Sequence, residues 1–313
     1  MTGTLVGQSA SSVRSARVAL ERRAIAAVKR RRARIPAIGE VDRGSEGRGR
    51  TALVTGASSG IGRCMAELLA AKGYDVIVVA RREQRLKELQ ADLEPRFGVR
   101  IHPLPCDLTS ADAAAAIVAE LGRRDLRVDL LVNNAGYDML GKFLDHDWEA
   151  HEKFVRLMSL GVAELCHRLL PHMVGQRWGR IINVTSVGGM FPGAPSMALY
   201  TAAKSFVHKL SEAIDAEYRD QGVHCTVSAP GATETEIFEI VGIVEYWDDN
   251  LLPQISMMRP EVVARQAYAA AMAGRKVVVH GAPNKIWAAT LLHSPKAVRY
   301  RLVDFLGKMQ PGG

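Results

Sequence analysis

The stretch Thr55-Gly56-Ala57-Ser58-Ser59-Gly60-Ile61-Gly62 decides the fold of this chain. Before it, the apolar run Ala52-Leu53-Val54 is typical of a strand buried in a parallel sheet. After it, apolar residues recur at spacings of three and four up to position 72, which predicts a helix. A strand, a glycine-rich turn and a helix in this order predict a dinucleotide-binding turn. The glycines let the backbone approach a pyrophosphate, and the helix N-terminus attracts the anion.

Short apolar runs and helical patterns alternate from position 50 onward. Strands are predicted at 52–54, 75–80, 100–104, 128–132, 179–184, 223–228 and 276–279. Helices are predicted near 61–72, 83–94, 110–121, 147–174, 199–221 and 260–273. This alternation predicts an α/β fold: a single doubly wound domain of Rossmann type, with a mostly parallel seven-stranded sheet covered by helices on both faces. We divide the chain into a basic extension (1–49), the Rossmann domain (50–282) and a basic amphipathic tail (283–313).

The net charge of +8 comes from the first fifty residues. Of 41 basic and 33 acidic residues, the first fifty positions hold 12 and 4, which leaves 29 of each sign in the remainder. The basic balance is therefore no evidence for nucleic-acid binding. Three interpretations of the extension stay open: a solvated, partly disordered segment, a helix on an anionic membrane surface, or a transit peptide. Residues 44–49 are expected to form a flexible linker.

The cysteines and the lengths of the apolar runs limit which classes of protein this chain can belong to. Cys64, Cys106, Cys166 and Cys225 lie far apart without metal-ligand spacing, which indicates neither a disulfide framework nor a metal site. No apolar stretch reaches the roughly 18 residues that a membrane span needs. These features favour a cytoplasmic location, with peripheral membrane association through the basic ends as the alternative.

A second group of motifs follows the later strands. Asn133-Asn134-Ala135-Gly136 comes after the fourth strand, and Ser186 comes after the fifth. Tyr200 and Lys204 are four residues apart, so they share one face of a helix. An unperturbed tyrosine has a pKa of about 10, and a nearby ammonium favours the phenolate and lowers that pKa. Tyr200 could therefore exchange a proton with an alcohol or a ketone.

Together with the turn T-G-x-x-x-G-x-G, these motifs make residues 51–281 resemble the short-chain dehydrogenase/reductase family. The resemblance implies an oxidoreductase that interconverts a carbonyl and an alcohol by hydride transfer. It implies that Ser186 binds the substrate oxygen, that Tyr200 is the acid or base, and that Lys204 supports Tyr200 and holds the nicotinamide ribose. Thr185 and Ser196 are weaker candidates for the role of Ser186.

The resemblance also implies the cofactor-binding positions. They are Thr55, Gly56, Ser58, Ser59, Gly60, Ile61, Gly62, Arg81, Arg82, Asp107, Leu108, Asn134, Ala135, Gly136, Tyr200, Lys204, Pro230, Gly231, Thr233 and Thr235. Arg81 and Arg82 follow the second strand, where a basic residue accepts the 2′-phosphate of NADP and an acid would bind the ribose of NAD. NADP(H) is therefore favoured over NAD(H). Asp107 would hydrogen-bond the adenine edge, although a helix cap is a competing explanation.

Met158 departs from the family pattern, because relatives usually place an asparagine there to complete a proton relay through water. Ser159 could substitute, or the proton could take another path. This departure keeps an alternative open: a non-catalytic dinucleotide-binding sensor or scaffold, possibly at a membrane surface.

Apolar side chains in residues 236–258 and in the loops near Tyr137 and Met190 favour a hydrophobic ketone, aldehyde or alcohol as substrate. The helices near 147–174 and 199–221 match those that relatives use in dimers and tetramers, so we expect a homo-oligomer. We expect no metal ion and no nucleic-acid partner.

Overall fold

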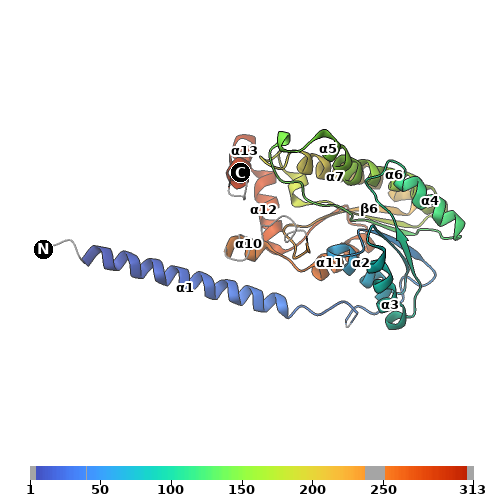
Figure 1. Ribbon diagram of the computed structural model, residues 1–313, viewed down its shortest axis with the longest axis horizontal. Helices are drawn as coiled ribbons and strands as arrows, with labels where there is room; N and C mark the ends of the chain where they lie inside the picture. The colour runs from blue at the N-terminus through green and yellow to red at the C-terminus, as the bar shows by residue number, and fades with distance from the viewer. Residues whose placement is uncertain (1–4, 40, 237–250, 309–313) are drawn as a thin grey trace.

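A parallel sheet lies at the centre of the computed structural model, which describes residues 5–39, 41–236 and 251–308 (Figure 1). The strands are β1 (Thr51–Thr55), β2 (Asp75–Ala80), β3 (Ile101–Pro105), β4 (Leu130–Asn133), β5 (Gly179–Val184), β6 (Val223–Ala229) and β7 (Val277–Val279). Their order is β3-β2-β1-β4-β5-β6-β7, and every pair is parallel. The predicted Rossmann-type architecture is confirmed, with each strand within two residues of its predicted bounds.

Two layers of helices cover the sheet (Figure 1). One face carries α2 (Gly60–Ala71), α3 (Glu83–Phe97) and α11 (Pro260–Met272). The other carries α4 (Ala113–Arg123), α6 (Gly161–Gly175) and α7 (Ala198–Tyr218). We call the apolar cluster under α2, α3 and α11 the first core and the cluster under α4, α6 and α7 the second core. Successive side chains of a strand point to opposite faces of the sheet. Ala52 and Val54 therefore belong to the first core, and Leu53 belongs to the second. Helices on both sides explain why the strands are continuous apolar runs.

The strand order reverses between β1 and β4. Because β1 pairs with β2 on one side and with β4 on the other, the loops that follow β1 and β4 diverge from adjacent strand ends. In open parallel sheets, ligands bind in the crevice at this reversal, outside the carboxyl ends of the strands. The glycine turn after β1 and the Asn133–Gly136 loop after β4 both lie there.

The long helix predicted near 147–174 is divided into three pieces. They are α5 (Trp148–Val155), a π-helical turn (Arg156–Leu160) and α6. The backbone N–H of Gly161 donates to the carbonyl of Arg156, five residues earlier, so one extra residue is accommodated in the turn. The sequence analysis predicted one continuous helix here and did not predict this turn.

Helices outside the predicted set lie at the two ends of the chain. The extension forms α1 (Leu5–Ala33), whose N-terminal part projects away from the sheet (Figure 1). The tail forms α12 (Ala282–His293) and α13 (Lys296–Lys308), which are separated by Ser294 and Pro295. The short α10 (Leu251–Ser256) packs beside α1.

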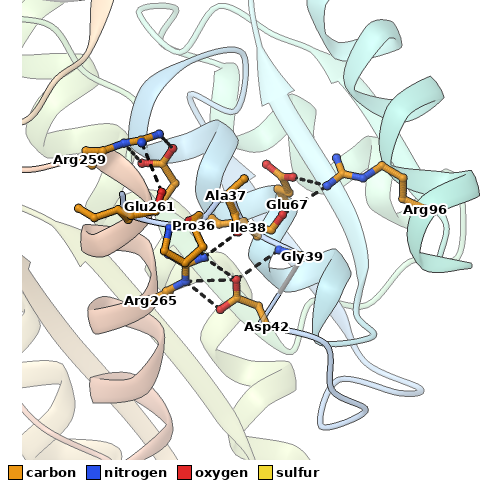
Figure 2. A network of polar contacts seen from close by, with 11 residues as sticks. Pro36, Ala37, Ile38, Gly39, Asp42, Glu67, Arg96, Arg259, Glu261 and Arg265 are labelled. Atoms are coloured by element: carbon orange, nitrogen blue, oxygen red, sulfur yellow. Dashed lines mark hydrogen bonds and ion pairs between the residues drawn. The ribbon is translucent and has the colours of Figure 1, made fainter. Parts of the chain in front are cut away.

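Residues 36–39 and Asp42 are held against the Rossmann core by burial and hydrogen bonds. Ile38 is only 1% exposed and packs among side chains of the first core. The Arg265 guanidinium binds the Asp42 carboxylate at 2.8 Å and donates to the carbonyls of Pro36 and Ala37 (Figure 2). Arg96 donates to the carbonyl of Ile38.

The expected flexible linker at 44–49 is instead held by hydrogen bonds. The N–H groups of Gly44 and Gly47 donate to the carbonyls of Ala71 and Lys72, at the end of α2. A side chain at Gly47 would meet the Tyr74 ring at 2.1 Å, so the segment is packed closely against the domain.

Replacing Ile38 tests whether this segment contributes to the stability of the domain. Ile38→Ala removes a buried side chain and should lower the free energy of unfolding by about 2–5 kcal/mol. Val41→Ala is the control, because Val41 is 68% exposed and should change that free energy by less than about 0.5 kcal/mol. Urea unfolding of both variants measures the difference. Equal, small effects would mean that the segment is not part of the core.

Candidate active site

The glycine turn and the loop after β4 interlock through Thr55. Its hydroxyl accepts hydrogen bonds from the backbone N–H groups of Asn134 (2.9 Å) and Ala135 (3.1 Å). A side chain at Gly56, which has φ +66°, would meet the Ala135 backbone at 2.9 Å. At Gly62 it would meet the Gly56 carbonyl at 2.3 Å. Only glycine fits at these two places, as the motif requires.

The start of α2 is suited to an anion. The Ser59 backbone is extended, and no side chain caps the first turn of the helix. Beside it lies a cavity of about 360 Å³ lined by residues 57–60 and by side chains of α2 and α3. Gly60, at φ +53°, faces Thr235 of the loop after β6, and a side chain there would meet the Thr235 methyl group at 3.0 Å. The uncapped N-terminus and close-packed glycines therefore fit a pyrophosphate.

Arginines gather beside this turn. The Arg82 guanidinium donates to the hydroxyls of Ser58 (2.9 Å) and Ser59 (3.1 Å). Arg82 and Arg85 both pair with the Glu236 carboxylate, at 3.0 and 2.5 Å. Arg81 is exposed at the end of β2. A carboxylate thus already binds two basic groups next to the turn, an arrangement that also suits a phosphate. Sequence reasoning missed Arg85 and Glu236, which lie 151 residues apart in the chain.

Asp107 makes a local hydrogen-bonded turn after β3. One oxygen of its carboxylate accepts from both the backbone N–H (3.1 Å) and the hydroxyl (2.9 Å) of Thr109. The competing explanation, a helix cap, is wrong: the residue that precedes α4 is Asp112, whereas Asp107 accepts hydrogen bonds within its own loop. Its predicted contact with adenine stays a prediction, as does that of Leu108.

Ser186, Tyr200 and Lys204 come together where β5 ends against α7. The Ser186 hydroxyl accepts from the backbone N–H of Gly188 at 3.1 Å and lies near enough to the Tyr200 phenol to affect its pKa. The Lys204 ammonium donates to the Val184 carbonyl at 3.0 Å and lies 5.8 Å from the centre of the Tyr200 ring. Thr185, a weaker candidate, is buried and donates to the Ser228 carbonyl.

Burial dominates the electrostatics of this cluster. It raises the pKa of Tyr200 above its usual value, the Asp138 carboxylate raises that pKa further, and the hydrogen bond from Ser186 lowers it. Burial lowers the pKa of Lys204 to about 8, against the opposing attraction of Asp138. We expected the ammonium to lower the pKa of Tyr200. The pKa of Tyr200 is raised instead, by burial and by Asp138, and Ser186 is the group that lowers it.

Sequence reasoning also missed Asp138. This residue follows the Asn133–Gly136 loop, and its charge acts on both Tyr200 and Lys204. Burial raises the pKa of the Asp138 carboxyl, while Lys204 lowers it. An acid placed just beyond the carboxyl end of a central strand was the available signal, but the sequence did not show that the loop turns toward α7.

Met158 lies in the π-helical turn beside the site. It is 2% exposed and packs with Phe154 and Ala203 in a small apolar cluster that Tyr200 borders. A side chain at Gly136 would meet the Met158 sulfur at 2.6 Å. A thioether therefore fills the space behind the Asn133–Gly136 loop.

Part of the expected substrate wall lies outside the described residues. This part is Ile237, Phe238, Ile240, Val241, Ile243, Val244, Tyr246 and Trp247. Within the described part, Tyr137 packs edge-on against Phe154, with ring centres 5.3 Å apart. Tyr137 and Met139 also border the apolar cluster of Met158. The described wall of the site is therefore apolar.

The loop after β6 is fixed by residues from the end of the chain. The Asn284 side chain sits where a side chain on Gly231 would be, at 2.6 Å. Thr233 is buried and pairs with Met258, and its hydroxyl donates to the Gly231 carbonyl.

The part of the chain that the structure describes contains neither a group of histidine, cysteine and acidic side chains able to hold a metal ion nor a helix long and apolar enough to cross a membrane.

Comparison with known proteins identifies the family. A family model for short chain dehydrogenases matches residues 50–242. A short chain dehydrogenase of Pseudocercospora fijiensis is 37% identical over 195 residues, which is 60% of this chain and 61% of the relative. A very-long-chain 3-oxoacyl-CoA reductase of Danio rerio is 32% identical over 196 residues, 61% of this chain and 62% of the relative. The matches thus span about three fifths of these curated relatives.

A solved structure adds to this result. The short-chain dehydrogenase from Sphingobium yanoikuyae in complex with NADPH superposes with a TM-score of 0.68 at 34% identity, covering 81% of this chain and 94% of its own. The resemblance inferred from the motifs is confirmed, and the chain belongs to the short-chain dehydrogenase family of oxidoreductases.

Proposed function

We propose that this protein interconverts a hydrophobic ketone or aldehyde and its alcohol, with NADP(H) as hydride carrier. The proposal is carried by one observation: the half-buried Ser186 and Tyr200 meet the buried Lys204 at the carboxyl edge of the sheet. The apolar wall around Tyr137 and Met139 supports a hydrophobic substrate. One relative is named for a very-long-chain 3-oxoacyl substrate, and one related structure contains NADPH.

The nicotinamide cofactor supplies or accepts the hydride when bound. In this proposal the glycine turn and the start of α2 hold its pyrophosphate, and Arg81 and Arg82 hold the 2′-phosphate of NADP. Asp107 and Leu108 bind the adenine, and residues 134–136 lie along the nicotinamide ribose. Pro230, Gly231, Thr233 and Thr235 border the carboxamide.

The side chains of the cluster manage the proton. During reduction, the Tyr200 phenol donates its proton to the carbonyl oxygen. The Ser186 hydroxyl donates a hydrogen bond to the same oxygen and stabilises the charge that develops there. The Lys204 ammonium, held by the Val184 carbonyl, favours the phenolate that remains. A raised pKa keeps Tyr200 protonated near neutrality, which is the form that reduction requires.

Removing the phenolic hydroxyl of Tyr200 tests whether this residue is the proton donor. Tyr200→Phe should reduce turnover of hydrophobic carbonyls by about 10²–10⁴-fold, because the proton donor is lost. NADPH consumption measures the rate, and NADPH fluorescence measures binding. Tyr218→Phe, at the other end of α7, is the control and should keep the rate. If the wild-type protein binds NADPH tightly but turns over no carbonyl in a broad panel, the sensor or scaffold alternative is correct.

The carboxylate of Asp138 should set the pH dependence of alcohol oxidation. Oxidation needs the phenolate, and a negative charge nearby makes the phenolate harder to form. Asp138→Asn removes that charge, lowers the pKa of Tyr200 and should move the rising limb of the pH–rate profile to lower pH. Asp112→Asn is the matched control, because Asp112 is exposed at the start of α4. An unchanged profile, or a shift to higher pH, would contradict this assignment.

The arginines beside the turn should select the phosphorylated cofactor. Hydrogen bonds to a charged group contribute about 1.5–3 kcal/mol, so Arg81→Ala and Arg82→Ala should each raise the Kd of NADPH by about 10- to 100-fold. The Kd of NADH should hardly change. Arg100→Ala is the control, because Arg100 lies at the start of β3 on the opposite edge of the sheet. Equal losses for NADPH and NADH would reject a 2′-phosphate site.

We also propose a homo-oligomer that forms through α5 and α7. These helices pack together and, with the π-helical turn, expose the large apolar side chains of Trp148, Leu160 and Phe206. Light scattering gives the mass in solution, and a monomer would reject the proposal.

A cytoplasmic location and peripheral contact of the basic ends with anionic membranes remain further proposals, and liposome sedimentation tests the membrane contact.

A further inference from the structure

Arg32 differs from the other arginines at the end of α1. Arg30 and Arg31 are exposed, whereas Arg32 is only 9% exposed. Its guanidinium donates to the backbone carbonyl of Gln254 at 3.2 Å and to the side-chain carbonyl of the same residue. It also pairs with the Glu234 carboxylate at 3.1 Å. Gln254 belongs to α10 and is fully buried, so a charged side chain of the extension reaches into the body of the protein.

Glu234 belongs to the loop of residues 230–235, and Gln254 belongs to α10, whose following segment pairs with that loop. Glu234 lies between Thr233 and Thr235, and its backbone N–H donates to the Met258 carbonyl at 2.9 Å. The Met258 N–H donates in turn to the Ala232 carbonyl at 2.9 Å. The segment that leaves α10 is therefore hydrogen-bonded along the loop of residues 230–235.

Asn284, at the start of α12, also holds the end of α10 and the loop after β6 in place. The Asn284 amide donates to the carbonyls of Ser256 (3.1 Å) and His280 (3.0 Å), and it occupies the space beside Gly231. The end of α10, the loop after β6 and the start of α12 thus hold one another, and Arg32 joins them from the N-terminal side.

The end of α1 is itself held in place. The Arg259 guanidinium donates to the Ile35 carbonyl at 3.4 Å, and Arg265 holds residues 36, 37 and 42. Arg32, Glu234 and Arg259 line a cavity of about 560 Å³ between α1 and the start of α11. Arg32 therefore approaches α10 from an anchored helix end, and the family match, which begins at residue 50, does not include this helix.

We propose that Arg32 is a positioning residue for the substrate site. Through this guanidinium, the N-terminal extension fixes α10 and the loop of residues 230–235, the loop assigned above to the nicotinamide end. Loss of the guanidinium leaves the buried Gln254 carbonyl and the Glu234 carboxylate without this partner, so both segments move more freely. The claim that Arg32 positions a substrate site rests on the proposed function. The claim that Arg32 holds α10 and the loop of residues 230–235 in place does not.

The full-length chain tests the coupling with Arg32→Gln, Arg32→Lys and the control Arg31→Ala. Hydrogen exchange reports on residues 230–236 and 254–258 without any substrate. Arg32→Gln should speed their exchange by about tenfold or more, because a cross-link to α1 is lost. Arg32→Lys should be intermediate, since an ammonium can keep some of the three contacts. Arg31→Ala should match the wild type. Unchanged exchange in both Arg32 variants would overturn the proposal.

Kinetics separates positioning from general stability. With a hydrophobic ketone, Arg32→Gln should raise KM by about tenfold, with a thermal midpoint close to that of the wild type. A lowered thermal midpoint with unchanged KM and unchanged exchange in residues 230–236 would assign Arg32 a purely structural role. If the wild-type chain turns over no ketone, the proposed function fails, and the hydrogen-exchange result still decides whether Arg32 couples α1 to this region.

Discussion

The hydrogen bonds from the loop after β4 to the Thr55 hydroxyl are the contact on which the site depends. Strands β1 and β4 are neighbours, but their loops lead to helices on opposite faces of the sheet. Without a cross-link, the two loops would be free to separate at the strand ends. Thr55 joins them, and glycines at 56 and 62 make room for the Asn134 amide between them. A cofactor that crosses this reversal would therefore meet two loops with a fixed separation.

The chemistry of the site depends on a balance between burial and charge. Burial moves the pKa of Tyr200 up and that of Lys204 down, so each is biased toward its neutral form. Asp138 pushes both pKa values upward, because a negative charge disfavours the phenolate and favours the ammonium. The carboxylate therefore keeps a charged lysine beside a protonated tyrosine. That pair is suited to giving a proton away and then stabilising the phenolate that remains.

The sequence predicted the elements that depend on local patterns. The strands, the glycine turn and the Tyr200–Lys204 pair are short, contiguous signals, and the structure contains the strands and brings the pair together with Ser186. It could not predict contacts made by loops and chain ends. Glu236 meets Arg85 across 151 residues, and Arg32 meets Gln254 across 222. Such pairs depend on how the whole chain packs, and neither residue of a pair carries a local signal of the other.

The extension shows how a single composition can serve two purposes. Its basic residues look alike in the sequence, so their sum suggested a uniformly charged arm. The structure separates them: Arg30 and Arg31 face solvent, whereas Arg32 is withdrawn from water to meet Gln254 and Glu234. Burying a guanidinium costs free energy unless carbonyl and carboxylate groups compensate for the lost hydration. Because Arg32 has both kinds of partner, and because residues 36–39 and Asp42 anchor the chain beyond it, the end of α1 is held against the Rossmann domain. Arg30 and Arg31, which face solvent, remain free to contact an anionic surface such as the membrane proposed above.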